Sequence, residues 1–206
     1  MKDLVREQLD KTLTVLRAVR EDMAIHATLV EAAEMTAQAM KAGRKLMVAG
    51  NGGSAADAQH LVAEFVSRLC EDRPAMRAVA LTTDSSILTA VGNDYGYERV
   101  FERQVEALGQ TGDVFMGIST SGNSPNVLRA LELSRRMGIT TVGLSGRTGG
   151  RMGPLCDFHI RVSSEVTMHI QEVHLALEHI FCMIVERSYF SSEPCSHTQA
   201  TAEYVG

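Results

Sequence analysis

Hydroxyl side chains are concentrated in one short segment of this chain, Ser119-Thr120-Ser121-Gly122-Asn123-Ser124. An apolar run precedes the segment, and Pro125 follows it, which suits the first position of a helix with Ser124 as the N-cap. Four hydroxyls and the free backbone N–H groups of a helix N-terminus can surround a tetrahedral phosphate without any cation. A capping serine alone is common, whereas this density of hydroxyls around a glycine is not. We therefore predict that this loop binds a phosphate group.

A second loop, Gly50-Asn51-Gly52-Gly53-Ser54, joins an apolar run to a helical segment. Its glycines let the backbone approach a ligand, and the helix that follows points N–H groups at the loop, which favours an anion or a polar sugar edge. An ordinary strand–helix turn is the plain alternative. Gly50-x-Gly52-x-x-Ala55 also fits a loose dinucleotide pattern. That match is weak, because Asp84 lies over thirty residues beyond Gly50, where about twenty is usual.

Candidate acid–base and metal-binding residues occur on two expected helices. His60 and Glu64 are four residues apart and share a helix face, and Arg68 continues that stripe. Such a pair can bind zinc or transfer protons, and a solvated helical pair is the alternative. On the last helix, Gln171 and His179 lie about 80° apart around the axis and could converge. Spacing alone does not choose between His179 and His174, nor does it establish a metal.

Asn93-Asp94 lies within residues 91–97, between two expected helical segments. Its amide and carboxylate could bond sugar hydroxyls. A turn with an Asx cap is an equal alternative.

The elements that must position these residues follow a clear pattern. Residues 2 to about 42 have apolar residues at spacings of three and four, which predicts two long helices whose apolar faces a partner subunit could cover. From Lys45 onward, short apolar strands alternate with turns and helices. This alternation predicts an α/β fold with a five-stranded parallel sheet flanked by helices, and ligands at the carboxyl ends of its strands. The expected strands are 45–50, 78–81, 114–118, 140–144 and 158–162, and the later helices are 55–69, 85–91, 98–108, 125–137 and 170–189.

Composition narrows the class of protein. The chain of 206 residues suits one domain, and its net charge of −5 argues against a role in binding nucleic acid or an anionic membrane. Met1–Arg6 lacks the apolar core of a signal peptide, and no apolar run is long enough to span a membrane. The four cysteines form no C-x-x-C pair, so we expect neither a zinc knuckle nor a disulfide framework. We predict a cytoplasmic protein with a loose polar tail over 191–206.

Taken together, four motifs resemble the phosphoheptose isomerase family of the sugar-isomerase (SIS) fold, a flavodoxin-like architecture. The resemblance covers a single SIS domain over 1–190, with N-terminal helices over 1–42 and a flexible tail over 191–206. The segments that carry it are 49–60 with Glu64, 91–96, 118–124 and 170–174 with His179.

The resemblance implies conversion of sedoheptulose 7-phosphate to D-glycero-D-manno-heptose 7-phosphate, in heptose precursor biosynthesis for lipopolysaccharide and other surface polysaccharide. It implies a homotetramer with active sites between subunits, one zinc ion per subunit, and neither nucleic-acid nor membrane partners. The implied phosphate ligands are Ser119, Thr120, Ser121 and Ser124. The implied sugar-lining residues are Asn51, Gly52, Gly53, Asn93 and Asp94, and we add Ser54, Glu64, Arg68 and Gln171 to the substrate-binding set. The implied zinc ligands are His60, Glu64, Gln171 and His179, with Glu64 and His179 also as the acid–base pair.

Two alternatives accompany this hypothesis. One SIS relative is a non-enzymatic adaptor that associates with the replication initiator; it lacks the carboxylate at the position of Glu64, so Glu64 favours an enzyme. The other alternative is an SIS isomerase for a different phosphosugar. The chain also departs from the family at Met168-His169, where a basic residue usually precedes Ile-Gln, and this bears on fine specificity.

Overall fold

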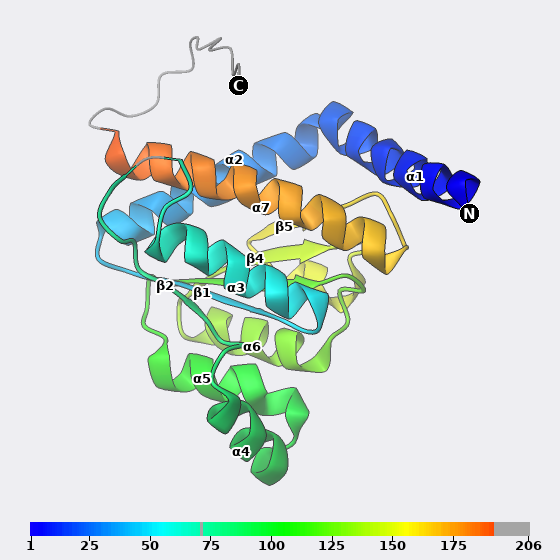
Figure 1. Cartoon of the computed structure of the whole chain (residues 1–206). Helices are drawn as coiled ribbons and strands as arrows, with labels where there is room; N and C mark the ends of the chain where they lie inside the picture. The colour runs from blue at the N-terminus through cyan, green and yellow to red at the C-terminus, as the bar shows by residue number, and fades with distance from the viewer. Residues whose placement is uncertain (71, 192–206) are drawn as a thin grey trace.

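The computed structural model describes residues 1–70 and 72–191, and Figure 1 shows the arrangement of its elements. Two helices precede an alternation of strands and helices. In chain order the elements are α1 (Lys2–Glu21), α2 (Met23–Lys41), β1 (Leu46–Gly50), α3 (Gly53–Val66), β2 (Ala78–Ala80), α4 (Ser85–Tyr95), η1 (Tyr97–Arg99), α5 (Val100–Leu108), β3 (Val114–Ser119), α6 (Pro125–Arg136), β4 (Thr140–Ser145), η2 (Gly150–Leu155), β5 (Phe158–Arg161) and α7 (Thr167–Phe190).

The five strands form one sheet in the order β2-β1-β3-β4-β5, and every neighbouring pair is parallel. Gly50 at the end of β1 pairs with Ile118, and Ser119 at the end of β3 pairs with Ser145. The chain order reverses between β1 and β3, so the loops after these two strands leave toward opposite faces. This is the switch point at which open parallel sheets bind ligands. The predicted α/β fold is confirmed.

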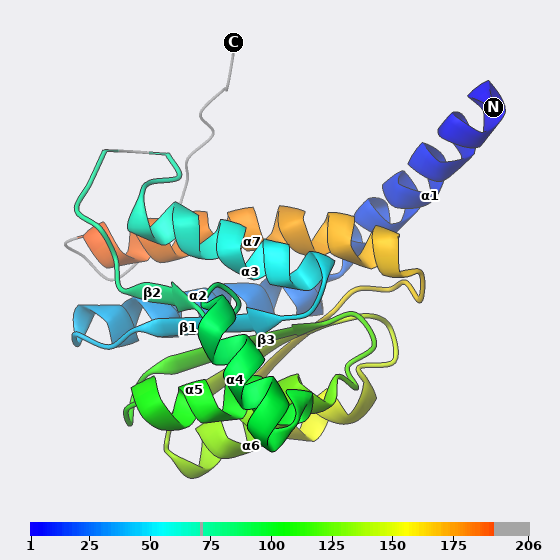
Figure 2. The same cartoon turned by 60° about the horizontal axis from the view of Figure 1, so that its bottom comes forward.

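Helices cover both faces of the sheet (Figure 2). Helices α2, α3 and α7 share one apolar core with one face, while α5 and α6 share the other. The strands divide their side chains between the two cores by alternation, as in β1, where Val48 belongs to the first core and Met47 to the second. Helices α3 and α7 therefore pack against each other on one side of the sheet.

The N-terminal region forms two helices, as predicted. Asp22 separates them, because its carboxylate accepts hydrogen bonds from the backbone N–H groups of Ala24 at 3.0 Å and Ile25 at 3.1 Å and so caps α2. Helix α1 extends away from the rest of the molecule (Figure 2). Among the helices of the described residues, none is both long and apolar enough to cross a membrane.

Two helix ends differ from the prediction. Helix α3 ends at Val66 rather than near Leu69, because Arg73 binds the carbonyl groups of its last turn. Arg68 therefore lies beyond the helix, and the prediction that it continues the stripe of His60 and Glu64 was wrong. Helix α4 extends to Tyr95, so residues 93–94 lie in its last turn instead of a connecting turn. The predicted tail lies outside the described residues, except for Ser191.

Candidate active site

The hydroxyl-rich loop begins at the carboxyl end of β3, as predicted. Ser124 is the N-cap of α6 with Pro125 at its first turn, and the hydroxyl of Ser124 lies 2.9 Å from that of Ser119. The backbone N–H of Asn123 donates to Oγ of Ser121 at 3.1 Å. Gly122 has φ of +65°, and a Cβ there would lie 2.1 Å from the carbonyl oxygen of Gly149, so only glycine fits this turn. The loop is thus a compact cup of hydroxyl and N–H groups at a helix N-terminus.

The glycine-rich loop after β1 is tied to this cup by a pair of amides. Nδ2 of Asn51 donates to Oδ1 of Asn126 at 2.9 Å, and Nδ2 of Asn126 donates to Oδ1 of Asn51 at 2.8 Å. Asn126 is the second residue of α6 and is buried. The hydroxyl of Tyr97 also donates to Oδ1 of Asn51, at 3.3 Å. The two loops at the switch point are therefore fixed to one another.

The start of α3 lies against the start of α7. A Cβ on Gly53 would lie 2.5 Å from Nε2 of Gln171, so the glycine allows the Gln171 amide to approach the helix N-terminus. The same Nε2 lies 3.5 Å from the hydroxyl of the buried Ser54. Gln171 thus faces the glycine-rich loop.

His60, Glu64 and His179 come together farther along the same two helices. Nε2 of His60 lies 2.8 Å from Nε2 of His179 and 3.4 Å from Oε1 of Glu64. Helix α3 supplies the first histidine and the glutamate one turn apart, and α7 supplies the second histidine. These three are the predicted acid–base and metal-binding residues on which the hypothesis depends most.

The donor atoms of this group fit a metal ion. One ligand atom from each of the three residues lies within 4.8 Å of the other two, and His and Glu are ligands that zinc accepts. Two imidazole nitrogens that face each other also need a shared proton or cation between them. Gln171 lies eight residues before His179, which corresponds to about 12 Å along α7. Its place as a fourth ligand stays a prediction.

The helix pair also carries buried carboxyl oxygens without hydrogen-bond partners among the described residues: both oxygens of Glu178 and Oδ2 of the half-buried Asp57. Burial and the nearby carboxylate of Asp57 raise the pKa of Glu178 to about 8, and burial raises the pKa of Asp57 to about 6 against the opposing effect of His60. A neutral Glu178 at pH 7 is consistent with its lack of a cationic partner. Next to the His60–Glu64–His179 group, Glu178 is therefore mainly neutral at pH 7, whereas Asp57, with its lower pKa, is mainly ionised.

His174, the alternative to His179, lies elsewhere. It is fully buried, and its Nε2 is 3.2 Å from the carbonyl oxygen of Ser145 at the end of β4. Burial lowers the pKa of His174 to about 4. His169 is also buried, with Nδ1 3.1 Å from the hydroxyl of Thr12 on α1 and 3.2 Å from Glu172. Both histidines serve packing between elements.

Three predicted substrate-binding residues, Asn93, Asp94 and Arg68, form no hydrogen bond with the other predicted site residues in the part of the chain that the structure describes. Asn93 and Asp94 are exposed on α4, where Nδ2 of Asn93 donates to Oδ1 of Asp94 at 2.7 Å. Arg68 is exposed beyond the end of α3. Their roles stay predictions.

Sequence reasoning missed residues that hold the site together. Asn126, Tyr97 and Arg73 make hydrogen bonds to Asn51 or to the backbone of α3. Tyr97 belongs to the segment already singled out around Asn93. Asn126 immediately follows the helix-starting proline, and a polar residue on the inner face of α6 was the available signal. Arg73 carried no pattern of its own.

The fold and site together define a class of protein. The chain is a doubly wound α/β protein with a hydroxyl-rich loop at the switch point and a His/Glu/His group on two flanking helices, and the SIS-domain family model matches residues 9–146. The chain is 48% identical to the phosphoheptose isomerase of Aneurinibacillus thermoaerophilus, over 94% of this chain and 98% of that one. It is 57% identical to phosphoheptose isomerase 2 of Campylobacter jejuni, over 79% of this chain and 82% of that one.

The structural comparison agrees with the sequence comparison. The solved phosphoheptose isomerase of Neisseria gonorrhoeae matches with a TM-score of 0.84 and 38% identity, covering 90% of this chain and 98% of that one. The corresponding protein of Francisella tularensis matches with a TM-score of 0.86 and 31% identity, over 90% and 97% of the two chains. The chain belongs to the SIS-domain family and, within it, to the phosphoheptose isomerases.

Proposed function

We propose that this chain is an aldose–ketose isomerase that converts sedoheptulose 7-phosphate to D-glycero-D-manno-heptose 7-phosphate in heptose precursor biosynthesis. The convergence of His60, Glu64 and His179 in a member of the phosphoheptose isomerase family carries the proposal. The adaptor alternative has no use for the carboxylate of Glu64 beside two imidazoles. Surface polysaccharide is the destination of the heptose in this proposal.

The chemistry requires groups of these types. Aldose–ketose isomerisation moves a proton between adjacent carbons through an enediol, so one group takes the proton and another protonates or polarises oxygen. We assign these roles to Glu64 and His179. The His60 imidazole lies beside both, with its Nε2 2.8 Å from His179 and 3.4 Å from Glu64.

The remaining assignments concern binding. Ser119, Thr120, Ser121 and Ser124 hold the phosphate, and Asn51, Gly52, Gly53 and Ser54 line the sugar with Asn93, Asp94 and Arg68. His60, Glu64, Gln171 and His179 hold one zinc ion per subunit. A bound zinc ion supplies Lewis acidity for an oxyanion. The 1–190 segment acts as a single SIS domain in this proposal, and cytoplasmic location stays a prediction from the sequence.

One observation supports the homotetramer, and active sites between subunits are part of the same proposal. The projecting helix α1 exposes the apolar side chains of Leu4, Val5 and Leu9, which are 48%, 61% and 60% exposed. A neighbouring subunit would cover these side chains. Light scattering of the purified protein measures the subunit number.

A panel of ketose phosphates tests the function. Purified protein is incubated with sedoheptulose 7-phosphate and with pentose and hexose ketose phosphates, each with and without added zinc, and aldose phosphate formation is followed by NMR. We expect the highest kcat/KM on the heptose phosphate. Absence of aldoheptose phosphate under both zinc conditions would support the adaptor. A higher kcat/KM on a pentose or hexose phosphate would identify an isomerase of another sugar.

A further inference from the structure

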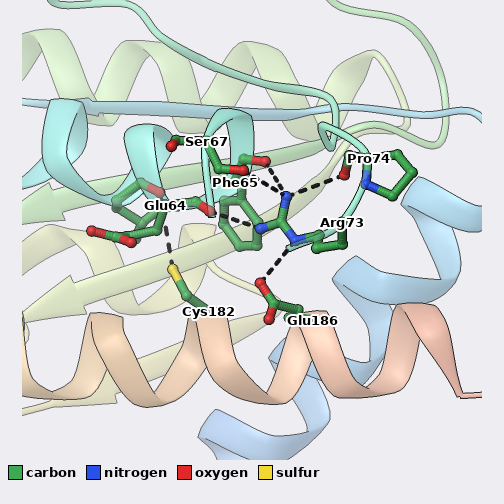
Figure 3. Close-up of polar contacts among 8 residues, drawn as sticks. Glu64, Phe65, Ser67, Arg73, Pro74, Cys182 and Glu186 are labelled. Atoms are coloured by element: carbon green, nitrogen blue, oxygen red, sulfur yellow. Dashed lines mark hydrogen bonds and ion pairs between the residues drawn. The ribbon is translucent and has the colours of Figure 1, made fainter. Parts of the chain in front are cut away.

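Arg73 binds the carboxyl-terminal end of α3 from the segment that leads to β2. Its Nη1 donates to the carbonyl oxygen of Phe65 and its Nη2 to that of Glu64, each at 2.7 Å, while Nη1 also donates to Ser67 at 3.3 Å. The last turn of a helix leaves carbonyl groups without intrahelical partners and carries partial negative charge. A planar guanidinium satisfies several of these carbonyls at once, as Figure 3 shows.

The other edge of the guanidinium faces α7. Nε of Arg73 donates to Oε2 of Glu186 at 2.8 Å, and only 6% and 9% of the two side chains are exposed. Glu186 comes seven residues after His179, so the two project from α7 within about 20° of each other. The rings of Phe65 and Phe181 also meet between these helices, with centroids 6.4 Å apart. Arg73 therefore joins the end of α3 to the face of α7 that carries His179.

We propose that Arg73 is a positioning residue for the His60–Glu64–His179 group, an inference that rests on the function proposed for that site. Arg73 donates to the backbone carbonyl of Glu64. The Glu64 carboxylate points away from the guanidinium (Figure 3), and its Oε1 lies 3.4 Å from Nε2 of His60. One buried side chain thus sets both the end of the helix that carries Glu64 and its distance from the helix that carries His179.

Arg73→Lys tests this role, because lysine keeps the charge but cannot bond the α3 carbonyls and Glu186 in the same geometry. We expect kcat on sedoheptulose 7-phosphate to fall at least tenfold, since small misplacements of reacting groups are costly. KM should stay within threefold, because the hydroxyl-rich loop proposed to hold the phosphate lies between β3 and α6 and makes no hydrogen bond with Arg73. Arg135→Lys is the matched control: Arg135 also donates to a backbone carbonyl, that of Pro154, and lies near the end of α6. Its kcat should stay within twofold of wild type.

Two further measurements separate positioning from loss of fold. Circular dichroism and thermal unfolding give the folded fraction at the assay temperature, and competition with a chromophoric indicator gives zinc affinity, which should fall at least tenfold in Arg73→Lys. Glu186→Gln retains the carbonyl bonds of Arg73 and removes only the ionic partner, so it decides the question if Arg73→Lys does not fold. We expect a kcat loss of at least threefold in Glu186→Gln with KM unchanged.

Several results would overturn the proposal. They are an unchanged kcat and zinc affinity in folded Arg73→Lys, an unchanged kcat in Glu186→Gln, or a loss of activity that matches the loss of folded protein. A wild-type protein without turnover would remove the proposed function, and zinc affinity alone would then decide the role of Arg73. A wild type with neither turnover nor zinc binding would overturn both.

Discussion

The hydroxyl-rich loop and the His60–Glu64–His179 group on the helix pair differ in how the chain builds them. The loop forms contacts between residues two to five positions apart, such as Ser119 with Ser124 and Ser121 with Asn123. His60 and His179 are 119 positions apart and meet only because α3 packs on α7. The loop therefore depends on local backbone geometry, and the His60–Glu64–His179 group depends on the packing of two helices.

This difference separates recognition from reaction. A local cup of hydroxyl and N–H groups suits any phosphorylated ligand and says little about what happens to it. The helix pair contributes the groups that can move a proton. Substitutions in the loop should accordingly weaken binding, and substitutions on the helix pair should slow turnover.

Glu64→Gln should have the largest effect on turnover. The change preserves the size of the side chain and removes the carboxylate, so we expect kcat to fall by about 10³-fold, within the usual range for loss of an acid–base group. Steady-state kinetics with sedoheptulose 7-phosphate measures the loss, and circular dichroism checks the fold. Glu132→Gln, at an exposed position of α6, is the control. Retention of more than a tenth of wild-type kcat would remove Glu64 from the mechanism.

Ser124→Ala should act mainly on binding. If Ser124 binds the phosphate as proposed, removal of its hydroxyl costs about 1.5–3 kcal/mol of binding free energy, so KM should rise by about tenfold or more. Inorganic phosphate should also inhibit the variant less than the wild type. The comparison between loop and helix pair would fail if kcat fell by more than KM rose.

Asn126→Ala should have a moderate effect on both quantities. The substitution removes both hydrogen bonds between the two amides and leaves Nδ2 of Asn51 without a partner, while Oδ1 keeps its bond from Tyr97, at a cost of about 1–3 kcal/mol in the free energy of unfolding. We expect kcat/KM to fall several-fold, because the two loops at the switch point are no longer fixed to each other. Urea unfolding and steady-state kinetics measure the two effects. Unchanged values for both would show that the amide pair is dispensable.

Acid should affect the stability of the β4–β5 side through His159. Burial lowers the pKa of His159 from 6.5 to about 4, and its Nε2 lies 2.7 Å from the hydroxyl of Ser145. Between these two values the unfolded chain binds more protons than the folded one, so stability is full above pH 6.5 and is lost as pH falls toward 4. These two pKa values correspond to a loss of about 1.8 kcal/mol between pH 7 and pH 5. Because the ring is only partly buried, solvent screening lowers the effect, and we expect His159→Gln to reduce the loss in free energy of unfolding by about 1 kcal/mol. It should leave kcat at pH 8 within twofold. An identical pH dependence in the variant and the wild type would show that His159 does not titrate in this range.

The sequence predicted most of the fold because its signals are local. Apolar strands separated by glycine- and serine-rich turns indicated five parallel strands, and residues 119–124 with Pro125 indicated a loop and the start of α6. The end of α3 was predicted too late, because the residue that binds its last carbonyl groups, Arg73, comes seven positions after Val66. No helical periodicity records such a contact.

The site was predictable only in part for the same reason. Spacing placed His60 and Glu64 on one face of α3 but left His174 and His179 as alternatives on α7. The packing of α7 turns His174 toward Ser145 in the interior and His179 toward His60. Family resemblance named His179 in advance, whereas the pairing of Asn51 with Asn126 across 75 positions had no local signal.

The absence of a side chain at Gly53 has a consequence for engineering. The Gln171 amide occupies the space where a Cβ at residue 53 would lie, so Gly53→Ala places a methyl group 2.5 Å from the present position of Nε2 and forces the amide out. One added carbon on α3 therefore changes the position of a side chain on α7 without changing that residue. Gly53→Ala thus displaces the Gln171 amide, whereas a substitution of Gln171 removes it. Comparison of the two variants separates the effect of the position of the amide from the effect of its chemistry.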